Sequence, residues 1–487
     1  MIRALVGKEA RAQAPVLAAS LLAVAAAAAF TRFRMFGPYA YLLGAAALGA
    51  LSIGHEYSHR TLGTLLAQPV PRLRLLLAKL AVLTPMLIVL SAVAVAVTEM
   101  RADAALAYAV LPVLAGLFVA PWLTMVCRGP LAGAVFTLTL PGLILSTTAL
   151  AYLVWYGHGP GQGFDVLVAS RGTLAVCLIG SVMTWPAFRR LEAIEGAFPE
   201  VRLPAWFGRR DTAGLAAPAS RARSVVMALV MKELRLQQMA FVVMGIVPIG
   251  WLALTLSLRP KGVDTEEIFV ALMLPCGALV AMLIGALASA EERRLGTLEW
   301  QLLLPLAAWR QWAIKVAVVV SLALLLPLGV PALLAALSGA RVFGWLSPTF
   351  AAVVVALAIG SLYVSSLSGS GVAALLAAAP AVLGAGLLLE LLLAYQGRVV
   401  LEVAARAFGW KSPRIAPSAD SMRAYSAVWW LISAAVVGLL AWFGLSNHRS
   451  ADRASARLRT QVVWLVVAVT AAVTVLAAAK AWLRIPL

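Results

Sequence analysis

The residues with the clearest potential for chemistry are the histidines and the glutamate of HEYSH, residues 55–59. On a helix, the spacing H-E-x-x-H places His55 and His59 on one face, where they can bind zinc beside a glutamate general base. Such a site needs a third protein ligand. The nearest carboxylates, Glu99 and Asp103, fall on the opposite membrane face in the topology derived below. Because this third ligand is not evident, an intramembrane zinc metalloprotease is an alternative hypothesis and not the main one.

A longer polar stretch that includes this segment occurs twice, each time between long apolar runs. The copies read HEYSHRTLGTLLAQPVPRLRLLLAK, residues 55–79, and EERRLGTLEWQLLLPLAAWRQWAIK, residues 291–315. Each has charged residues before Leu-Gly-Thr-Leu, followed by a proline, an arginine and a lysine. The first copy is about three residues shorter between its threonine and its proline, and the second copy contains no histidine. The agreement indicates one duplicated functional element.

A related basic segment precedes each copy, with two apolar runs between them. ALVGKEARAQ begins at Ala4, and ALVMKELRLQ begins at Ala228. Because the second version lies inside the chain, we interpret the first as a lead-in to a spanning helix and not as an export signal. Both are expected to lie at the membrane surface as basic amphipathic segments. The residues that mark them are Lys8, Glu9, Lys232, Glu233 and Arg235.

The composition defines the class of protein. With 63% hydrophobic residues, 12% charged residues and a mean hydropathy of +0.95, this 487-residue chain cannot cover its apolar surface in water. Its net charge of +19 comes from basic residues clustered between apolar runs, where they suit membrane orientation and anionic head groups. This pattern disfavours nucleic acid as a partner. The sequence predicts a polytopic membrane protein.

A helix needs about 20 apolar residues to cross the hydrocarbon core of a bilayer. The runs that meet this requirement lie at roughly 14–31, 38–54, 80–98, 104–127, 131–155, 166–188, 239–258, 268–290, 316–337, 348–366, 371–395, 425–445 and 461–480. The first twelve form two sets of six, and the last has no counterpart in the first half.

Basic residues set the expected orientation. The segments 189–238 and 446–460 are rich in arginine and lie six predicted spans apart, so both are expected in the cytoplasm, with the N-terminus and both copies of the duplicated stretch. Six spans per half give repeats of one orientation, related by an axis along the membrane normal. We therefore predict an all-α polytopic membrane protein with two parallel six-helix repeats and an extra C-terminal transmembrane helix. The expected parts are a first six-span half at 1–190, a basic linker at 191–224, a second six-span half at 225–446, and a basic loop with the extra span at 447–487.

The second copy of the duplicated stretch closely resembles the cytoplasmic element after the second span in type-2 permeases of ATP-binding-cassette (ABC) exporters. The first copy is similar to it, and the lead-in segments and six spans per half also fit this family. The resemblance implies a permease subunit with two fused halves, which is not itself an enzyme, in a bacterial plasma (inner) membrane. In the family this element is a coupling helix that docks onto a cytoplasmic ATPase. Carried over by position, the residues expected at that contact are Glu56, Arg60, Gly63, Thr64, Glu291, Glu292, Arg293, Gly296, Thr297 and Glu299.

The chain lacks the phosphate-loop pattern G-x-x-x-x-G-K-[ST], so ATP hydrolysis is expected in a separate subunit. The resemblance implies two copies of a cytoplasmic ABC ATPase that carry ATP and Mg, and no cofactor bound by this chain. Membrane lipids and an unidentified substrate complete the expected partners. Glu390, the most interior acid of the apolar runs, either faces a polar cavity or lies close enough to the outer surface to be solvated. A non-transporting membrane scaffold is the remaining alternative.

Overall fold

In the computed structural model, the described residues are 2–29, 37–58, 61–67, 69–97, 102–156, 164–191, 225–258, 265–304, 306–338, 347–378, 381, 419–450 and 455–482. Within them the chain forms helices and no strand. Eight of these helices are long and apolar enough to cross a membrane, or nine if the bent pair α9 (Val225–Leu236) and α10 (Gln238–Leu258) counts as one span. The prediction of an all-α polytopic membrane protein is confirmed.

Each predicted span of the first half corresponds to a long helix or to a continuous series of helices. The elements are α1 (Ile2–Ala29), α2 (Gly37–Ser58), α3 (Leu62–Leu66), α4 (Arg72–Val97), α5 (Ala102–Leu114), η2 (Ala115–Val119), α6 (Ala120–Cys127), α7 (Pro130–Tyr156) and α8 (Phe164–Arg189). The short helix α3 belongs to the duplicated stretch. The other elements coincide with the apolar runs.

The second half follows the same order after α9 and α10. Its elements are α11 (Thr265–Leu295), α12 (Thr297–Leu302), α13 (Ala308–Leu324), η4 (Leu325–Gly329), α14 (Val330–Ser338), α15 (Pro348–Leu367), α17 (Ala419–His448) and the additional α18 (Ser455–Trp482). The short helix α12 stands where α3 stands in the first half. Of the predicted span 371–395, only residues 371–378 and 381 are described. The linker 192–224 and Glu390 lie outside the described residues.

Several threonine hydroxyls within the spans bond to carbonyl groups of their own helices. Thr84 donates to the carbonyl of Leu80, Thr124 to that of Ala120, and Thr184 to that of Gly180. A polar group facing hydrocarbon without a partner is costly, so these i−4 bonds let the apolar runs contain threonine.

Glycines at matching positions let the second span of each half approach its neighbour closely. A Cβ on Gly49 of α2 would lie 2.0 Å from the carbonyl oxygen of Gly116 in η2. A Cβ on Gly285 of α11 would lie 2.2 Å from the carbonyl oxygen of Ala358 in α15. Small residues at such crossings are typical of packed membrane helices. The similarity between the two halves therefore extends beyond the polar stretches to the packing of the spanning helices.

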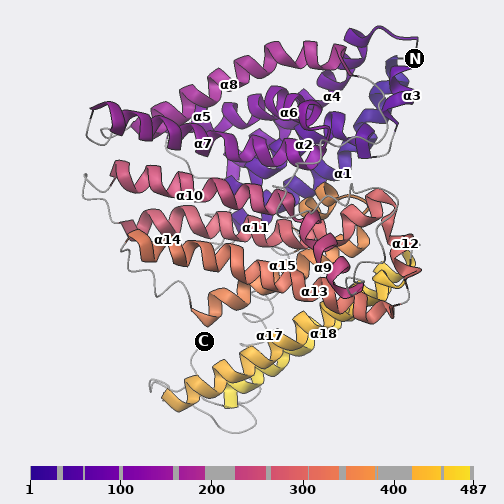
Figure 1. Ribbon diagram of the computed structural model, residues 1–487, viewed down its shortest axis with the longest axis vertical. Helices are drawn as coiled ribbons and strands as arrows, with labels where there is room; N and C mark the ends of the chain where they lie inside the picture. Colours follow the sequence, from indigo (N-terminus) through magenta and orange to yellow (C-terminus); the bar gives the residue numbers. More distant parts are fainter. Residues whose placement is uncertain are drawn as a thin grey trace, which may run out of the picture.

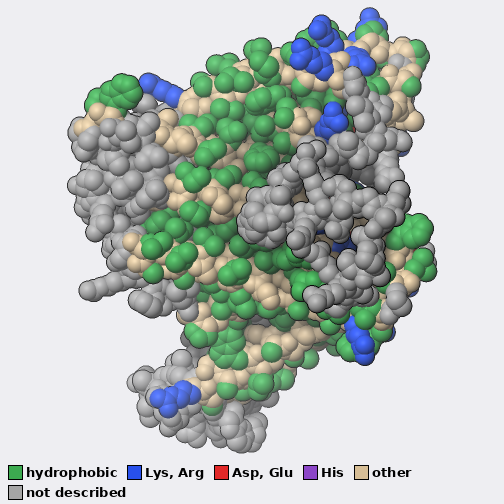
Figure 2. Space-filling view, viewed as in Figure 1, with side chains coloured by type: hydrophobic (Ala, Val, Ile, Leu, Met, Phe, Trp, Pro, Cys, Tyr) green, Lys and Arg blue, Asp and Glu red, His purple; other side chains and the backbone are tan. Residues whose placement is uncertain are grey.

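The halves pack against each other through α7 and α10, which lie side by side (Figure 1). One apolar core continues across this boundary, because Leu51 of α2 and Val135 of α7 pack with Val243 of α10 and Ile284 of α11. In the space-filling view, apolar side chains cover the middle of the molecule, and Lys and Arg side chains lie toward the ends of the helices (Figure 2). The helices α3 and α12 both lie at the right-hand end in Figure 1.

Candidate functional site

In the first half, a buried lysine joins the lead-in segment to the duplicated stretch. Lys79 of α4 is 1% exposed, and its Nζ lies 2.7 Å from Glu9 Oε1 on α1 and 3.4 Å from Glu56 Oε1 on α2. It also donates to the carbonyl oxygen of Ser52 at 3.0 Å. Lys8, which is exposed, pairs with Glu56 at 3.1 Å. Two lysines and two glutamates thus connect three helices.

The second half contains the same cluster. Lys315 of α13 is fully buried, and its Nζ lies 3.0 Å from Glu233 Oε1 on α9 and 2.8 Å from Glu292 Oε1 on α11. It also donates to the carbonyl oxygen of Ala288, four residues before Glu292 as Ser52 is four residues before Glu56. Lys232 pairs with Glu292, as Lys8 does with Glu56.

These two ion-pair clusters determine how the duplicated stretches align. The spacing from Glu56 to Lys79 (79 − 56 = 23) equals that from Glu292 to Lys315 (315 − 292 = 23). The Leu-Gly-Thr-Leu segments are displaced within this constant frame. Gly63 lies inside the helix α3, whereas Gly296 precedes α12 with φ +69°, a left-handed conformation that favours glycine. The displacement accounts for the shorter threonine-to-proline distance in the first copy.

Pairing and hydrogen bonding make the burial of these charges possible. An unpaired charge inside a protein is strongly unfavourable, and removal of one partner leaves the other uncompensated. Burial by itself would raise the pKa of Glu292, but the positive charges of Lys315 and Lys232 outweigh it and lower the pKa to about 2. Glu292 lies just beyond the predicted span 268–290. Because its pKa lies well below 7, its carboxylate is ionised at neutral pH.

Each cluster also contacts the neighbouring short helix or its first turn. In the first half, the Thr61 hydroxyl at the start of α3 donates to Glu56. In the second half, Lys232 donates to the side chain of Gln301 within α12. These contacts connect α3 and α12 to the lead-in helix and to the adjacent long helices, so a displacement of either short helix would be transmitted to them.

The sixth span of each half is attached to this end of the molecule by an arginine. Arg72 at the start of α4 donates to the carbonyl oxygens of Arg189 and Leu191, at and beyond the end of α8. Arg293 at the end of α11 donates to the carbonyl oxygens of Asn447 and Ser450, at and beyond the end of α17. Cationic side chains at helix C-termini satisfy otherwise unpaired carbonyl groups. Sequence reasoning missed Arg72. Other basic residues also stand at the ends of spanning helices, so its position gave no distinguishing signal.

The predicted coupling residues divide into a buried and an exposed group. Glu56 and Glu292 are 1% and 0% exposed and serve the ion-pair clusters, while Glu291 is mostly buried and pairs with Arg294 at 3.1 Å. The residues exposed at the surface are Gly63, Thr64, Gly296 and Glu299, and those partly exposed are Arg293 and Thr297. Arg60 lies outside the described residues. Of the lead-in residues, Glu9 and Glu233 are buried, Lys8 and Arg235 are exposed, and Lys232 is intermediate.

Large apolar side chains are exposed at α12 and beside it, next to the exposed Glu299. Trp300 is 75% and Leu303 is 76% exposed, and Trp309 at the start of α13 is half exposed. The exposed residues of α3 are Gly63 and Thr64, both small. Sequence reasoning selected the charged residues and the Gly-Thr pairs of this stretch and missed Trp300 and Trp309. Their signal was a large aromatic side chain in a segment predicted to be cytoplasmic.

The structure uses Glu56 of HEYSH as an ion-pair partner. Its carboxylate contacts Lys8, Lys79 and Thr61, which is not the environment of a general base beside a metal-bound water. Among the described side chains, no group of three or more His, Cys, Asp or Glu residues could hold a metal ion. His59 lies outside the described part of the chain.

A buried amide pair attaches the extra helix α18. Gln461 Nε2 donates to Asn447 Oδ1 at 2.9 Å, and Asn447 Nδ2 donates to Ser366 Oγ at 3.0 Å. Tyr363 adds a hydrogen bond to Gln461 Oε1 at 3.1 Å. The network joins α15, α17 and α18 close to the residues that Arg293 contacts.

Comparison of the whole chain with protein-family models, with curated proteins and with solved structures finds no match.

Proposed function

We propose that this chain is the membrane-spanning permease subunit of an ATP-driven ABC exporter, with both permease halves in one polypeptide. The observation that carries the proposal is the pair of equivalent ion-pair clusters, each beside a short helix at the same end of the molecule. A transporter driven by a partner needs two such elements, one per half, that convert movement of the partner into movement of membrane helices.

The clusters suit this role because they resist local deformation. To move α12 independently of α9 would break the hydrogen bond from Lys232 to Gln301. To move α9 independently of α11 and α13 would separate Lys232 from Glu292 and Glu233 from Lys315, which leaves buried charge unpaired. The lower-energy response is movement of these helices together. The same argument holds for α1, α2 and α4 around Lys79. Displacement of the two units against each other would open or close a substrate path between the halves.

The surface of α12 supplies a means of binding the ATPase. Tryptophan is enriched among the residues that dominate protein–protein binding energy, and Trp300 and Leu303 are exposed next to the acidic Glu299. The partner in this proposal is a separate cytoplasmic ATPase, in two copies, that supplies ATP and Mg. The cargo is unidentified.

The test is affinity purification of the full chain from its native membrane, scored for a co-purifying phosphate-loop ATPase. The variant Trp300→Ser should reduce recovery of the ATPase, because loss of a binding hot spot costs about 2 kcal/mol or more. Trp155→Ser is the matched control, since Trp155 is 84% exposed at the end of α7, away from α12.

Recovery of an ATPase with the wild type and with Trp155→Ser, together with its loss in Trp300→Ser, supports the proposal. If no ATPase accompanies the wild-type chain, the exporter assignment is wrong, and a non-transporting scaffold becomes the better account. Stoichiometric zinc that depends on His55 would instead favour the metalloprotease.

A further inference from the structure

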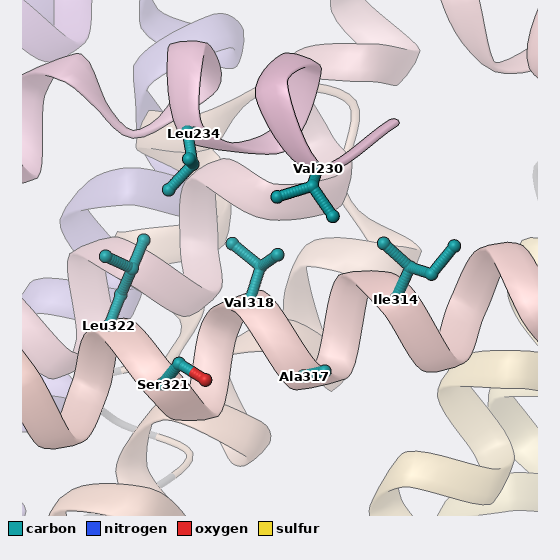
Figure 3. A pocket seen from close by; sticks show the side chains of 7 residues that line it. All are labelled: Val230, Leu234, Ile314, Ala317, Val318, Ser321 and Leu322. Atoms are coloured by element: carbon teal, nitrogen blue, oxygen red, sulfur yellow. The ribbon is translucent and has the colours of Figure 1, made fainter. Parts of the chain in front are cut away.

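An apolar groove separates the lead-in helix α9 from α13 (Figure 3). Its volume is about 300 Å³. Val230 and Leu234 of α9 face Ile314, Val318 and Leu322 of α13 across it. The remaining lining residues are Ala317 and Ser321 of α13. Seven side chains with a single hydroxyl among them define a site for a hydrocarbon group.

Two features distinguish this groove from the equivalent place in the first half. The axis of α9 is bent by 55° from that of α10, whereas α1 in the first half runs unbroken from Ile2 to Ala29 and packs along α4. The residues of the first half that match Leu234 and Ile314 are Ala10 and Ala78, whose small side chains permit close packing. Leu234 and Ile314 present larger apolar side chains to the space between α9 and α13.

An exposed cation lies on the same stripe of α13 as the groove. Arg310 precedes Ile314, Ala317 and Ser321 by four, seven and eleven residues, a spacing that places all four on one face of a helix. Its guanidinium stacks over the Trp309 ring at 5.3 Å from the centroid. Arginine with an interfacial tryptophan at a helix end is suited to the phosphate of a lipid head group.

We propose that the groove binds one acyl chain of an anionic phospholipid, with the phosphate beside Arg310. The length fits, because a helix rises about 18 Å over the twelve steps from Arg310 to Leu322, close to the roughly 15 Å of hydrocarbon in one leaflet. The bound lipid fills the space between α9 and α13 next to the Lys315 cluster. This binding does not depend on an ATPase, so it stands or falls separately from the proposed function.

The experiment reconstitutes the full chain in nanodiscs with phosphatidylglycerol that carries a diazirine in one acyl chain. After illumination, peptide mass spectrometry measures labelling of α9 and α13 relative to the exposed stretch of α8 around Val182, which is 66% exposed. Ala317→Trp fills the groove, Val230→Phe fills it from the opposite helix, and Ala81→Trp is the matched control at the equivalent position of α4. Arg310→Gln and labelled phosphatidylcholine test the head group.

The expected result is labelling of Val230, Leu234 and Ala317 above the α8 level, lost in Ala317→Trp and Val230→Phe but kept in Ala81→Trp. Labelling should fall about fivefold in Arg310→Gln or with phosphatidylcholine, the effect expected from one basic side chain at an anionic surface. Three results would overturn the proposal. They are labelling of α13 equal to that of α8, labelling unaffected by both filling variants, and labelling independent of both Arg310 and the head group.

Discussion

Lys315 of α13 and Glu233 of α9 form a buried ion pair with an Nζ to Oε1 distance of 3.0 Å, although 82 residues separate them in the sequence. Lys79 and Glu9 form the equivalent pair in the first half at 2.7 Å. Each pair fixes the lead-in helix to the third span of its half. The clusters therefore act as rigid connections at the end of the molecule where α3 and α12 lie.

The first prediction concerns Lys315. Replacement by Met leaves Glu233 and Glu292 buried without their shared cation, so the free energy of unfolding should fall by about 3–5 kcal/mol. Thermal unfolding of the purified chain in detergent measures the change. Arg310→Met, on the same helix but exposed, is the control and should change the free energy by less than about 0.5 kcal/mol. An unchanged unfolding temperature for Lys315→Met would contradict the description of the cluster.

The second prediction concerns acid stability. The pKa of Glu292 is lower in the folded protein than its ordinary value of 4.5, so its ionisation contributes stability that is fully present above about pH 5. That contribution should disappear as the pH falls from 4.5 toward about 2. Unfolding temperatures of the wild type and of Glu292→Gln should therefore differ at neutral pH and converge in acid. Glu299→Gln, at an exposed site, should follow the wild type, and parallel curves for Glu292→Gln at all pH values would refute the assignment.

The third prediction concerns the close approach of α11 to α15. A Cβ on Gly285 would meet the backbone oxygen of Ala358 at 2.2 Å, so Gly285→Ala should lower the free energy of unfolding by about 1–3 kcal/mol. In Gly360→Ala the new Cβ has no neighbour within 4 Å. That variant should be neutral or slightly stabilising because alanine favours a helix. Equal effects of the two substitutions would be inconsistent with the packing.

The fourth prediction concerns attachment of α18. Gln461→Leu leaves the buried Asn447 amide without its reciprocal partner, which should cost about 1–3 kcal/mol. The double variant Asn447→Leu/Gln461→Leu removes both partners and should be less destabilised than the sum of the single variants. A double-mutant cycle on thermal unfolding measures this coupling. Strict additivity would mean that the amide pair does not hold α18.

Hydropathy predicted the spans well because the requirement for about 20 apolar residues is strong and local. Apart from the run at 371–395, every predicted span coincides with a helix or a continuous series of helices. The bend of 55° between α9 and α10 lies at Gln237, although the sequence around this residue contains neither proline nor glycine. The unbroken α1, by contrast, contains Pro15. Tertiary packing decides which lead-in is bent.

The duplicated stretch was also recognisable from sequence, but the direction of its side chains was not. Alignment on Leu-Gly-Thr-Leu hides the match between Glu56 and Glu292, which the positions of Lys79 and Lys315 reveal. Each buried glutamate pairs with a lysine 23 residues later in the chain (79 − 56 and 315 − 292). Each also pairs with a lysine of the lead-in segment that precedes the first span of its half, Lys8 or Lys232. A lysine that opens a long apolar run was the available signal. Contact of the exposed members of this stretch with an ATPase stays a prediction.

Contact between the short helices and an ATPase is the central claim. Its most direct test places a photo-crosslinking amino acid at Thr64 of α3 or at Glu299 of α12, both exposed, in the full chain in its native membrane. The proposal predicts a crosslink from each position to a phosphate-loop ATPase and none from Trp155. Crosslinks from neither short helix to any such ATPase, in membranes where the chain is folded and abundant, would contradict it.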